Sequence, residues 1–173
     1  MAEESEYVFF WKVNEENGYL SQWYLSPFKA SVEIDGTAET CEFLTAEHWM
    51  MVHKALLFGD SAVAREILAT PAGSKNMAAV KALGRKVKNF DEETWVRERY
   101  RIVVEGNKHK FSANAELREK LVKTGDKPIV EASPRDRIWG VGFGAKNAPL
   151  KKERWGLNLL GKALEEVRGE LDN

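Results

Sequence analysis

The sequence predicts an α+β protein that is mainly helical, with a few short β-strands near its N-terminus. Aromatic and β-branched residues gather in the first 43 positions, which is typical of strands. From position 60 onward, capping residues and helix-stopping residues alternate along the chain. With 173 residues, of which 43% are hydrophobic, the chain can bury a sizeable core, so we expect one domain over residues 1–173. Met1–Glu6 is acidic and polar, and we expect a flexible tail there rather than a targeting peptide.

Three strands are expected before the first helix. Tyr7–Val13 is rich in aromatic and β-branched residues. Ser31–Ile34 alternates polar and apolar residues, and the Asp35-Gly36 pair that follows favours a two-residue hairpin turn. The return strand of this hairpin is then expected at Thr37–Phe43.

The first helix is expected to begin after Thr45, whose hydroxyl can accept a hydrogen bond from an otherwise unpaired backbone N–H. It is expected to end near Phe58-Gly59 and to be largely buried, because apolar residues recur along it. Glu47 and Lys54 stand seven residues apart, nearly two full turns, so both project from one face.

Further elements follow from capping residues and stops. We expect a helix capped by Asp60 or Ser61, a helix capped by Ser74, a helix capped by Asp91 with Trp95 on its buried side, a helix over Asn114–Val122, a short strand at Ile129-Val130, a loop over Ser133–Asn147, and a last helix over Trp155–Leu171.

Composition excludes several classes of function. The net charge is −1, so any binding to nucleic acid would have to be local. Cys41 is the single cysteine, which excludes an internal disulfide and fits a reducing compartment, so we expect a cytoplasmic protein. No run of 18 apolar residues exists, so no membrane partner is expected. The spacing of His48 and His53 does not suit a metal site, and neither a Walker loop nor a dinucleotide fingerprint is present, so no metal and no cofactor is expected.

Glu47 and Lys54 are the first candidates for chemistry. A carboxylate and an amine on one face of an apolar helix are costly to bury unless they are paired or used. The first-turn position of Glu47 favours its ionised form by roughly 0.3–1 kcal/mol. The plainer explanation is a structural ion pair. Burial would lower the pKa of Lys54 and the ion pair would raise it, and the sequence leaves open which effect is larger.

Three other stretches suit a ligand site. Arg85 in Gly84-Arg85-Lys86 can fork onto a phosphate or carboxylate, although a solvated charge favoured by the helix C-terminus is the simpler explanation. The loop Glu131–Gly142 combines acidic groups with a tryptophan and two glycines, which also fits an ordinary surface loop. Trp155–Gly161 predicts a helix start with bare N–H groups for phosphate, or else close helix packing through small residues.

Taken in order, these motifs resemble the NADAR family, also called YbiA-like N-glycosidases, over about Tyr19–Arg168. The motifs that carry the resemblance are Ser26-Pro27-Phe28, Ala46-Glu47-His48, Lys54-Ala55, Phe58-Gly59-Asp60, Gly84-Arg85, Trp95, Arg99, Lys110-Phe111, Thr124-Gly125-Asp126, Val130–Pro134, Asp136, Trp139–Gly142, Trp155–Asn158 and Leu160-Gly161. No single motif is specific, but their order and number are.

The resemblance implies hydrolysis of the N-glycosidic bond of a ribosylated base. The expected partner is ADP-ribose or a ribosylated-base small molecule, or ADP-ribosylated nucleic acid, with removal of ADP-ribose from guanine as the first expectation. Hydrolysis of riboflavin-pathway intermediates and a non-catalytic ADP-ribose-binding module are the alternatives, and a helical interaction domain without a small-molecule site is the plainest. The residues expected to be catalytic are Glu47, as the essential carboxylate, Lys54, as a Schiff-base or donor group, and Asp136. The residues expected to bind substrate are Trp95, Trp139, Arg85, Glu131, Gly140, Gly156, Asn158, Gln22 and His48.

The chain departs from the family pattern at one place. The family commonly has Ser-Asn-Phe before its Ser-Pro-Phe motif, and this chain has Ser21-Gln22-Trp23. If this segment lines the pocket, the longer amide and the bulkier ring would shift the choice of substrate.

Overall fold

The structure, a computed structural model, describes residues 5–172, so most of the expected N-terminal tail lies outside the described residues. The described residues form six α-helices and four short strands, which confirms the α+β, mainly helical prediction. The chain divides into two compact units. The insert unit is Gln22–Asn114, and the terminal unit consists of the residues up to Ser21 and those from Ala115 onward. The expectation of one domain over 1–173 stays a prediction.

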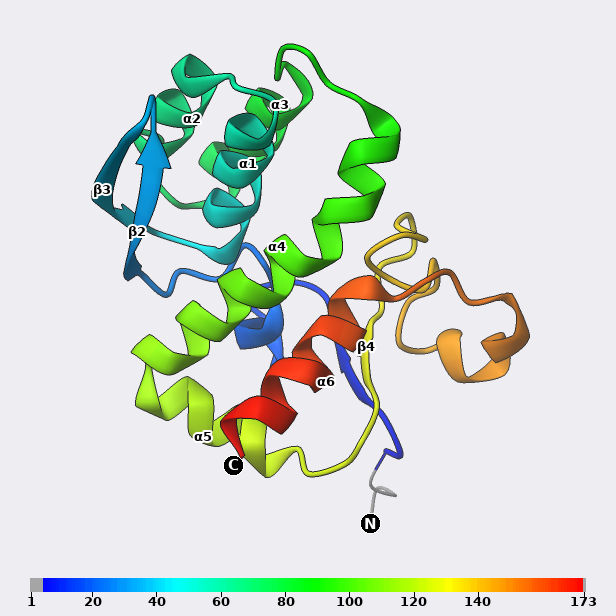
Figure 1. The fold of residues 1–173 in the computed structure, drawn as a ribbon. Coiled ribbons are helices and arrows are strands. Elements are labelled where there is room, and N and C mark those ends of the chain that lie inside the picture. Colours follow the sequence, from blue (N-terminus) through cyan, green and yellow to red (C-terminus); the bar gives the residue numbers. More distant parts are fainter. Residues whose placement is uncertain (1–4, 173) are drawn as a thin grey trace. The chain divides into compact units, whose positions relative to one another are not determined.

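The insert unit opens with the expected hairpin. Strand β2, Phe28–Ile34, pairs antiparallel with β3, Thr37–Phe43, in a register that joins Phe28 to Phe43 (Figure 1). Asp35 and Gly36 have φ angles of 53° and 81°, the left-handed pair that a two-residue hairpin turn requires. Alternate residues of β2 are buried, so one face of the hairpin covers the helices.

Four helices complete the insert unit: α1, Ala46–Leu57; α2, Ser61–Leu68; α3, Ser74–Arg85; and α4, Glu92–Ala113. Helix α1 is central, since it contacts each of the other three (Figure 1). Two glycines allow its neighbours to approach closely. A Cβ added at Gly84 would lie 2.1 Å from Sδ of Met51, and one added at Gly106 would lie 2.4 Å from Cδ1 of Trp49. The glycine of the Gly84-Arg85 motif therefore brings α3 against α1.

The helix caps follow the sequence with one exception. The side chains of Thr45, Asp60 and Asp91 each accept a hydrogen bond from a backbone N–H of the helix they precede, as predicted. Ser74 was predicted to cap α3 and does not. It is the first helical residue, and Gly73 holds the cap position with φ 111°, a conformation that serine adopts only under strain.

The terminal unit is built on a parallel pair of strands, β1, Val8–Phe10, and β4, Ile129–Glu131. It also contains α5, Ala115–Lys123, and α6, Leu159–Leu171 (Figure 1). Three short 3₁₀ turns complete it, at Gly18–Leu20, Ala148–Leu150 and Lys152–Arg154. β1 is shorter than the predicted Tyr7–Val13, because the chain turns at Lys12, whose carbonyl accepts from the N–H of Glu15.

The last helix begins later than predicted. The sequence predicts a start at Trp155, but α6 starts at Leu159. The N–H groups of residues 156–160 all donate to backbone carbonyls of the loop 137–141, at distances of 2.7–3.1 Å. Residues 156–160 therefore lie against the loop, with Asn158 in the left-handed region at φ 51° directly before α6 begins. The expectation of bare N–H groups at this helix start is wrong, and close packing is correct, since a Cβ added at Gly161 would lie 2.0 Å from the Ile129 carbonyl oxygen.

Among residues 5–172, no helix combines the length and the apolar character that crossing a membrane requires.

Candidate functional site

The two units share the predicted site residues equally. The insert unit holds Gln22, Glu47, His48, Lys54, Arg85 and Trp95. The terminal unit holds Glu131, Asp136, Trp139, Gly140, Gly156 and Asn158.

Glu47 is a buried carboxylate at the N-terminus of α1. Thr45 caps the helix two residues earlier, and only 7% of Glu47 is exposed. Its backbone N–H donates to the carbonyl of Gln22 at 3.0 Å, which fixes the preceding segment to the start of the helix. A carboxylate in this position lies where the helix dipole stabilises negative charge.

Lys54 lies on the same helix, two turns later, between two aromatic rings. Its Nζ is 4.8 Å from the ring centre of Phe90 and 5.4 Å from that of Trp95. Burial lowers the pKa of Lys54, and the charge of Arg85 lowers it further, whereas Glu47 and Glu92 raise it. The net direction is downward, so burial outweighs the attraction of the two carboxylates, and the amine loses its proton more readily than that of a surface lysine.

Phe90 and Glu92 also lie beside Lys54, and no sequence pattern predicted either as a site residue. Phe90 lies in the turn between α3 and α4, and 42% of it is exposed. Its ring meets that of Phe58 edge-on, with centroids 5.3 Å apart. The sequence shows an aromatic residue directly before the Asp91 cap, but it does not show that this residue lies beside Lys54.

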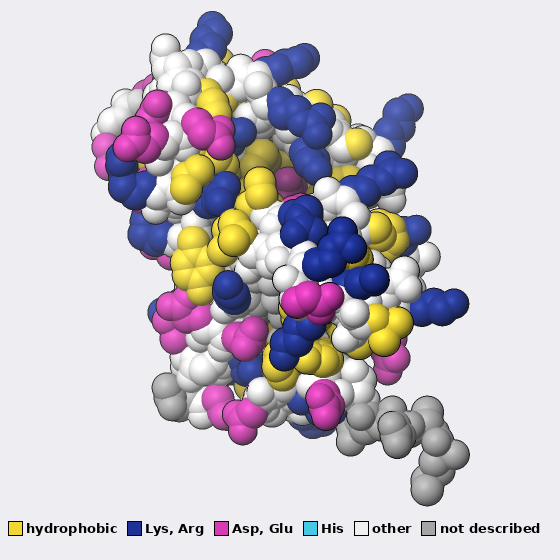
Figure 2. All heavy atoms as spheres, turned by 90° about the vertical axis from the view of Figure 1, so that its right-hand side faces the viewer, with side chains coloured by type: hydrophobic (Ala, Val, Ile, Leu, Met, Phe, Trp, Pro, Cys, Tyr) yellow, Lys and Arg dark blue, Asp and Glu magenta, His cyan; other side chains and the backbone are white. Residues whose placement is uncertain are grey.

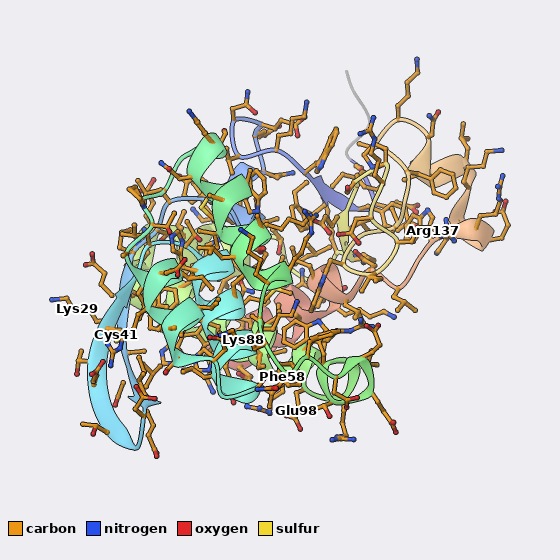
Figure 3. All side chains as sticks on the ribbon, turned by 90° about the horizontal axis from the view of Figure 1, so that it is seen from above. Lys29, Cys41, Phe58, Lys88, Glu98 and Arg137 are labelled. Atoms are coloured by element: carbon orange, nitrogen blue, oxygen red, sulfur yellow. The ribbon has the colours of Figure 1, made fainter. Side chains whose placement is uncertain are left out.

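Asp60 holds the turn that carries Phe90. Its carboxylate accepts from the N–H of Val63 at 3.2 Å, as the cap of α2, and from the N–H of Lys88 at 2.9 Å. Both bonds hold the pKa of Asp60 below its usual value. Phe58 and Lys88, which flank this connection, are labelled in Figure 3. Asn89 follows with φ 60°, so the chain reverses sharply just before Phe90.

His48 and Gln22 are held by protein groups in this structure. The Nε2–H of His48 donates to the carbonyl of Thr70 at 2.8 Å, so Nδ1 accepts from the Thr45 hydroxyl at 2.7 Å. Burial lowers the pKa of His48. Oε1 of Gln22 accepts from Nδ2 of Asn107 at 2.9 Å. These bonds give both side chains a structural explanation, and contact with substrate stays a prediction.

Arg85 and Trp95 differ in accessibility. Arg85 is exposed at the end of α3, and among residues 5–172 its guanidinium makes no hydrogen bond or ion pair. Trp95 is buried in α4, with one face toward the Lys54 amine. An anion could therefore reach Arg85 from solvent, whereas Trp95 serves mainly as a wall.

In the terminal unit, Asp136 organises the loop that carries Trp139. Its Oδ1 accepts from the N–H groups of Ile138 and Trp139, both at 2.9 Å. This arrangement fixes the backbone at Trp139, whose ring is partly exposed.

Packing explains the neighbouring residues. Asn158 accepts from the N–H of Glu131 and donates to the carbonyl of Ile129, so its amide pairs with the edge of β4. A Cβ at Gly140 would lie 2.7 Å from the Glu131 carbonyl oxygen. A Cβ at Gly156 would lie 2.2 Å from the carbonyl oxygen of Arg137. The three residues hold the loop, the strand and the approach to α6 together, and their role in substrate binding stays a prediction.

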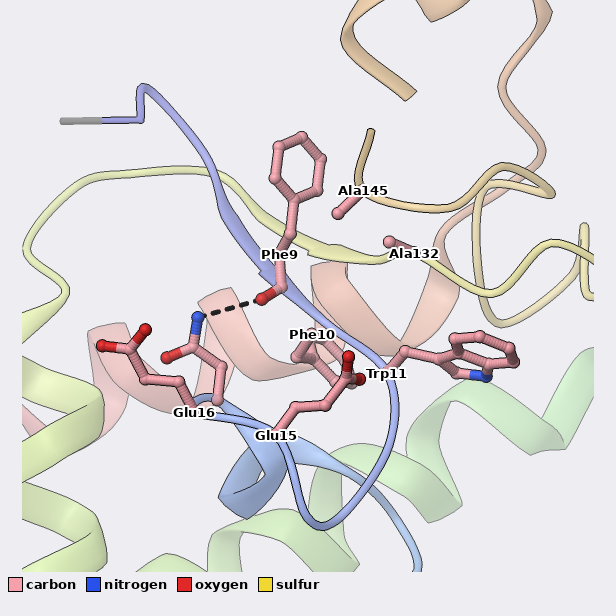
Figure 4. Close-up of a pocket in the computed structure, with 8 residues that line it drawn as sticks. Phe9, Phe10, Trp11, Glu15, Glu16, Ala132 and Ala145 are labelled. Atoms are coloured by element: carbon pink, nitrogen blue, oxygen red, sulfur yellow. Dashed lines mark hydrogen bonds between the residues drawn. The ribbon is translucent and has the colours of Figure 1, made fainter. Parts of the chain in front are cut away.

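A pocket of about 280 Å³ also lies in the terminal unit (Figure 4). It is lined by Phe9, Phe10, Trp11, Glu15, Glu16, Asn17, Ala132 and Ala145. Nδ2 of Asn17 donates to the Phe9 carbonyl at 2.9 Å, and Oε1 of Glu15 accepts from the N–H of Lys12. None of the predicted site residues lines this pocket.

Among the described residues, no group of three His, Cys, Asp or Glu side chains is arranged to hold a metal ion.

Comparison with known proteins gives a consistent result. The model of the NADAR domain matches residues 9–172. An N-glycosidase of Acanthamoeba polyphaga mimivirus is 42% identical over 97% of this chain and 98% of its own length. An N-glycosidase of Nostoc punctiforme is 34% identical over 96% of this chain and 93% of its own length.

Two matches at lower sequence identity were also found. The chain is 28% identical to a chloroplast riboflavin biosynthesis protein of Zea mays, of which it spans 26%. The NMR structure of the E. coli protein YbiA matches with a TM-score of 0.69 at 24% identity, over 95% of this chain and 84% of that chain, which shows that the fold is shared.

Proposed function

Because the chain belongs to the NADAR domain family, we propose that it is an N-glycosidase, a hydrolase that cleaves the N-glycosidic bond of a ribosylated base. The most similar relatives named above carry the name N-glycosidase and match along nearly their whole length. The substrate that we propose is ADP-ribose attached to guanine. The observation that carries the proposal is the buried Glu47 carboxylate together with the aromatic-walled Lys54 amine on one helix.

Glu47 supplies the electrostatic part of the mechanism. Cleavage of an N-glycosidic bond develops positive charge near C1 of the ribose, in an oxocarbenium-like transition state. An ionised carboxylate in a water-poor environment stabilises that charge far better than water does. A carboxylate can also orient the attacking water, which adds its oxygen to C1 while the base leaves with a proton.

Lys54 supplies a second route, which the family resemblance suggests. Its neutral amine attacks C1 and the bond from C1 to the base breaks, while the base leaves with a proton that the amine has lost. The bond from C1 to the ring oxygen then breaks, the ring oxygen takes a proton from water, and an iminium is left between C1 and Nζ. Water then hydrolyses the iminium, which releases the sugar aldehyde and restores the amine. The lowered pKa of Lys54 supports this step, because only the neutral amine is nucleophilic.

Apart from Asp136, the remaining predicted residues are proposed to bind rather than react. In the insert unit, Trp95 provides an aromatic face for the base and Arg85 provides a guanidinium for phosphate. In the terminal unit, Trp139 provides an aromatic face. Asp136 is proposed to act at the reacting sugar.

The test is release of base and ADP-ribose from ADP-ribosylated guanosine, measured by liquid chromatography and mass spectrometry. Glu47→Gln is expected to lower kcat by about 100-fold or more, because it removes a charge that acts on the transition state, while ADP-ribose binding changes only a few-fold. Glu116→Gln is the matched control, since Glu116 is also a first-turn carboxylate but is exposed on α5. Equal turnover by wild type and Glu47→Gln would remove Glu47 from the mechanism. Binding of ADP-ribose without any release by wild type would favour a non-catalytic binding module.

The maize relative gives a specific reason for a second candidate, hydrolysis of ribosylamino intermediates of riboflavin biosynthesis. The same assay, run with a ribosylaminopyrimidine as substrate, separates the two. A higher kcat/KM for the pyrimidine than for ADP-ribosyl-guanosine would assign the riboflavin function instead.

A further inference from the structure

One segment of the terminal unit is strongly basic although the whole chain is slightly acidic. Between positions 135 and 154 the sequence has six Lys or Arg residues and two acidic ones, a net charge of +4 against −1 for the chain. All six basic side chains are exposed. We call them the basic loop surface: Arg135, Arg137, Lys146, Lys151, Lys152 and Arg154. Figure 2 shows the side of the molecule that carries this segment, where exposed Lys and Arg side chains are seen with several Asp and Glu side chains among them.

The backbone beneath these charges is tightly braced. Nη2 of Arg137 donates to the carbonyl of Arg154 at 2.6 Å, which ties the two ends of the segment together. Nε1 of Trp155 donates to the carbonyl of Ala148 at 2.8 Å, and Ala148 is buried. The guanidinium of Arg154 lies 5.9 Å from the ring centre of Phe143. The charges therefore stand on a rigid platform, so binding an anion would cost little ordering of the loop.

Apolar groups are exposed within and beside the same segment. Leu150, between Lys146 and Lys151, is 74% exposed, and Ile138, next to Arg137, is 44% exposed. Arg137 is labelled in Figure 3. Cations interleaved with exposed apolar side chains are typical of surfaces that hold a nucleic-acid strand, since the cations meet phosphates and the apolar groups meet sugars and base faces.

We propose that the basic loop surface binds the phosphodiester backbone of a nucleic-acid strand that carries the ribosylated base. Six exposed cations are more than the pyrophosphate of one ADP-ribose can engage, and they match several successive phosphates. The segment also carries Asp136 and Trp139, so a strand held there is delivered to two of the proposed site residues. This inference rests on the proposed function only for the identity of the modified base.

The binding arm of the test uses the full-length protein and an unmodified, fluorescently labelled single-stranded oligonucleotide, followed by anisotropy at several salt concentrations. Lys146→Glu/Lys151→Glu is expected to weaken binding at least tenfold near 100 mM salt. It should also reduce the slope of log K against log salt by about 1.4, since each lost phosphate contact on a single strand contributes about 0.7. Lys75→Glu/Lys81→Glu makes the same change in net charge on exposed positions of α3 and is expected to change the slope much less.

The activity arm compares ADP-ribosylated guanine in an oligonucleotide with the same group as a nucleoside. Lys146→Glu/Lys151→Glu is expected to raise KM for the oligonucleotide at least tenfold and to leave the nucleoside kinetics unchanged. Equal weakening of oligonucleotide binding by both double variants would overturn the proposal in favour of bulk charge. A wild-type salt slope that corresponds to two phosphates or fewer, together with loss of binding when free ADP-ribose is added, would overturn it in favour of a small-anion site. The binding arm needs no turnover, so failure of the glycosidase assay and failure of this proposal are separate results.

Discussion

At the scale of single residues, the central result is the environment of Lys54. The spacing of Glu47 and Lys54 predicted a shared helix face, and that much follows from helix geometry alone. The sequence could not weigh burial against ion pairing, because the aromatic neighbour Phe90 lies 36 positions away and beyond two further helices. The structure shows that burial is the larger effect on the Lys54 pKa.

The lowered pKa of Lys54 predicts where a Schiff base forms. In the presence of substrate and borohydride, we expect the iminium at Lys54 to be reduced to a stable adduct that peptide mapping detects. The yield of this adduct is expected to rise with pH, with a midpoint below the range of ordinary lysines. Lys110 is an internal control, since desolvation lowers its pKa to about 7 but the side chain is fully buried and is therefore not expected to react. Trapping at Lys110 instead of Lys54, or trapping with an ordinary midpoint, would contradict this assignment.

Phe90 is expected to form a stacking face for the substrate. Phe90→Ala should raise KM about 5- to 50-fold with little change in kcat, since stacking on a base is worth about 1–3 kcal/mol and contributes before the chemical step. Phe90→Tyr should retain near wild-type KM. Val96→Ala is the control, because Val96 is similarly exposed on α4. An unchanged KM in Phe90→Ala would show that substrate does not reach this ring.

His53 makes the protein sensitive to acid. Its ring lies 3.9 Å from that of Trp49, and burial, together with the charges of Arg101 and His109, lowers its pKa from 6.5 to about 4. Between pH 6.5 and 4, the folded state keeps the His53 ring neutral whereas the unfolded state binds a proton. The stability that the neutral ring provides above pH 6.5 is therefore lost as the pH falls toward 4. The loss is roughly 3 kcal/mol. Denaturant unfolding from pH 7 to 4.5 should show this loss in wild type and a smaller loss in His53→Phe. Parallel pH curves for the two proteins would exclude His53 as the cause.

At the scale of elements, local sequence rules predicted correctly those turns and caps whose hydrogen bonds join residues close in sequence. The hairpin turn at Asp35-Gly36 and the caps at Thr45, Asp60 and Asp91 involve neighbours in sequence, so the residue types were sufficient. The start of α6 was mispredicted because its first N–H groups bond to a loop about twenty residues earlier, and no local pattern encodes that pairing. The second bond of Asp60, to the N–H of Lys88, was invisible for the same reason.

That second bond makes Asp60 more than a cap. Asp60→Ala is expected to destabilise the protein by about 2–4 kcal/mol, since it removes a cap worth about 1 kcal/mol and leaves the partly buried N–H of Lys88 unpaired. Asp91→Ala removes a cap alone and should cost only about 1 kcal/mol. Chemical denaturation measures both. The same replacement at Asp60 should also raise KM through the displaced Phe90, and equal losses of stability in the two variants would argue against the bridge.

At the scale of the whole molecule, the order of strand signals and helix caps predicted the α+β class, and composition predicted the absence of a bulk charge. It could not reveal that charge is unevenly distributed, because the net value of −1 averages a basic segment with acidic surroundings. Nor did any local pattern mark the division into an insert unit and a terminal unit. That division arises from pairing of β1 with β4, which depends on residues 121 positions apart, Val8 and Ile129.

The same pairing sets an order for folding during synthesis. Every segment of the insert unit lies between Gln22 and Asn114, and its two ends are close, with Nδ2 of Asn114 3.5 Å from Oγ of Ser26. It can fold as soon as Asn114 leaves the ribosome. Strand β1 is made first but must wait for β4, with its apolar residues unpaired, and formation of the insert unit shortens the loop that has to close. A chain stalled before Ile129 therefore exposes Val8–Phe10, a short aromatic strand, to chaperones and to other nascent chains.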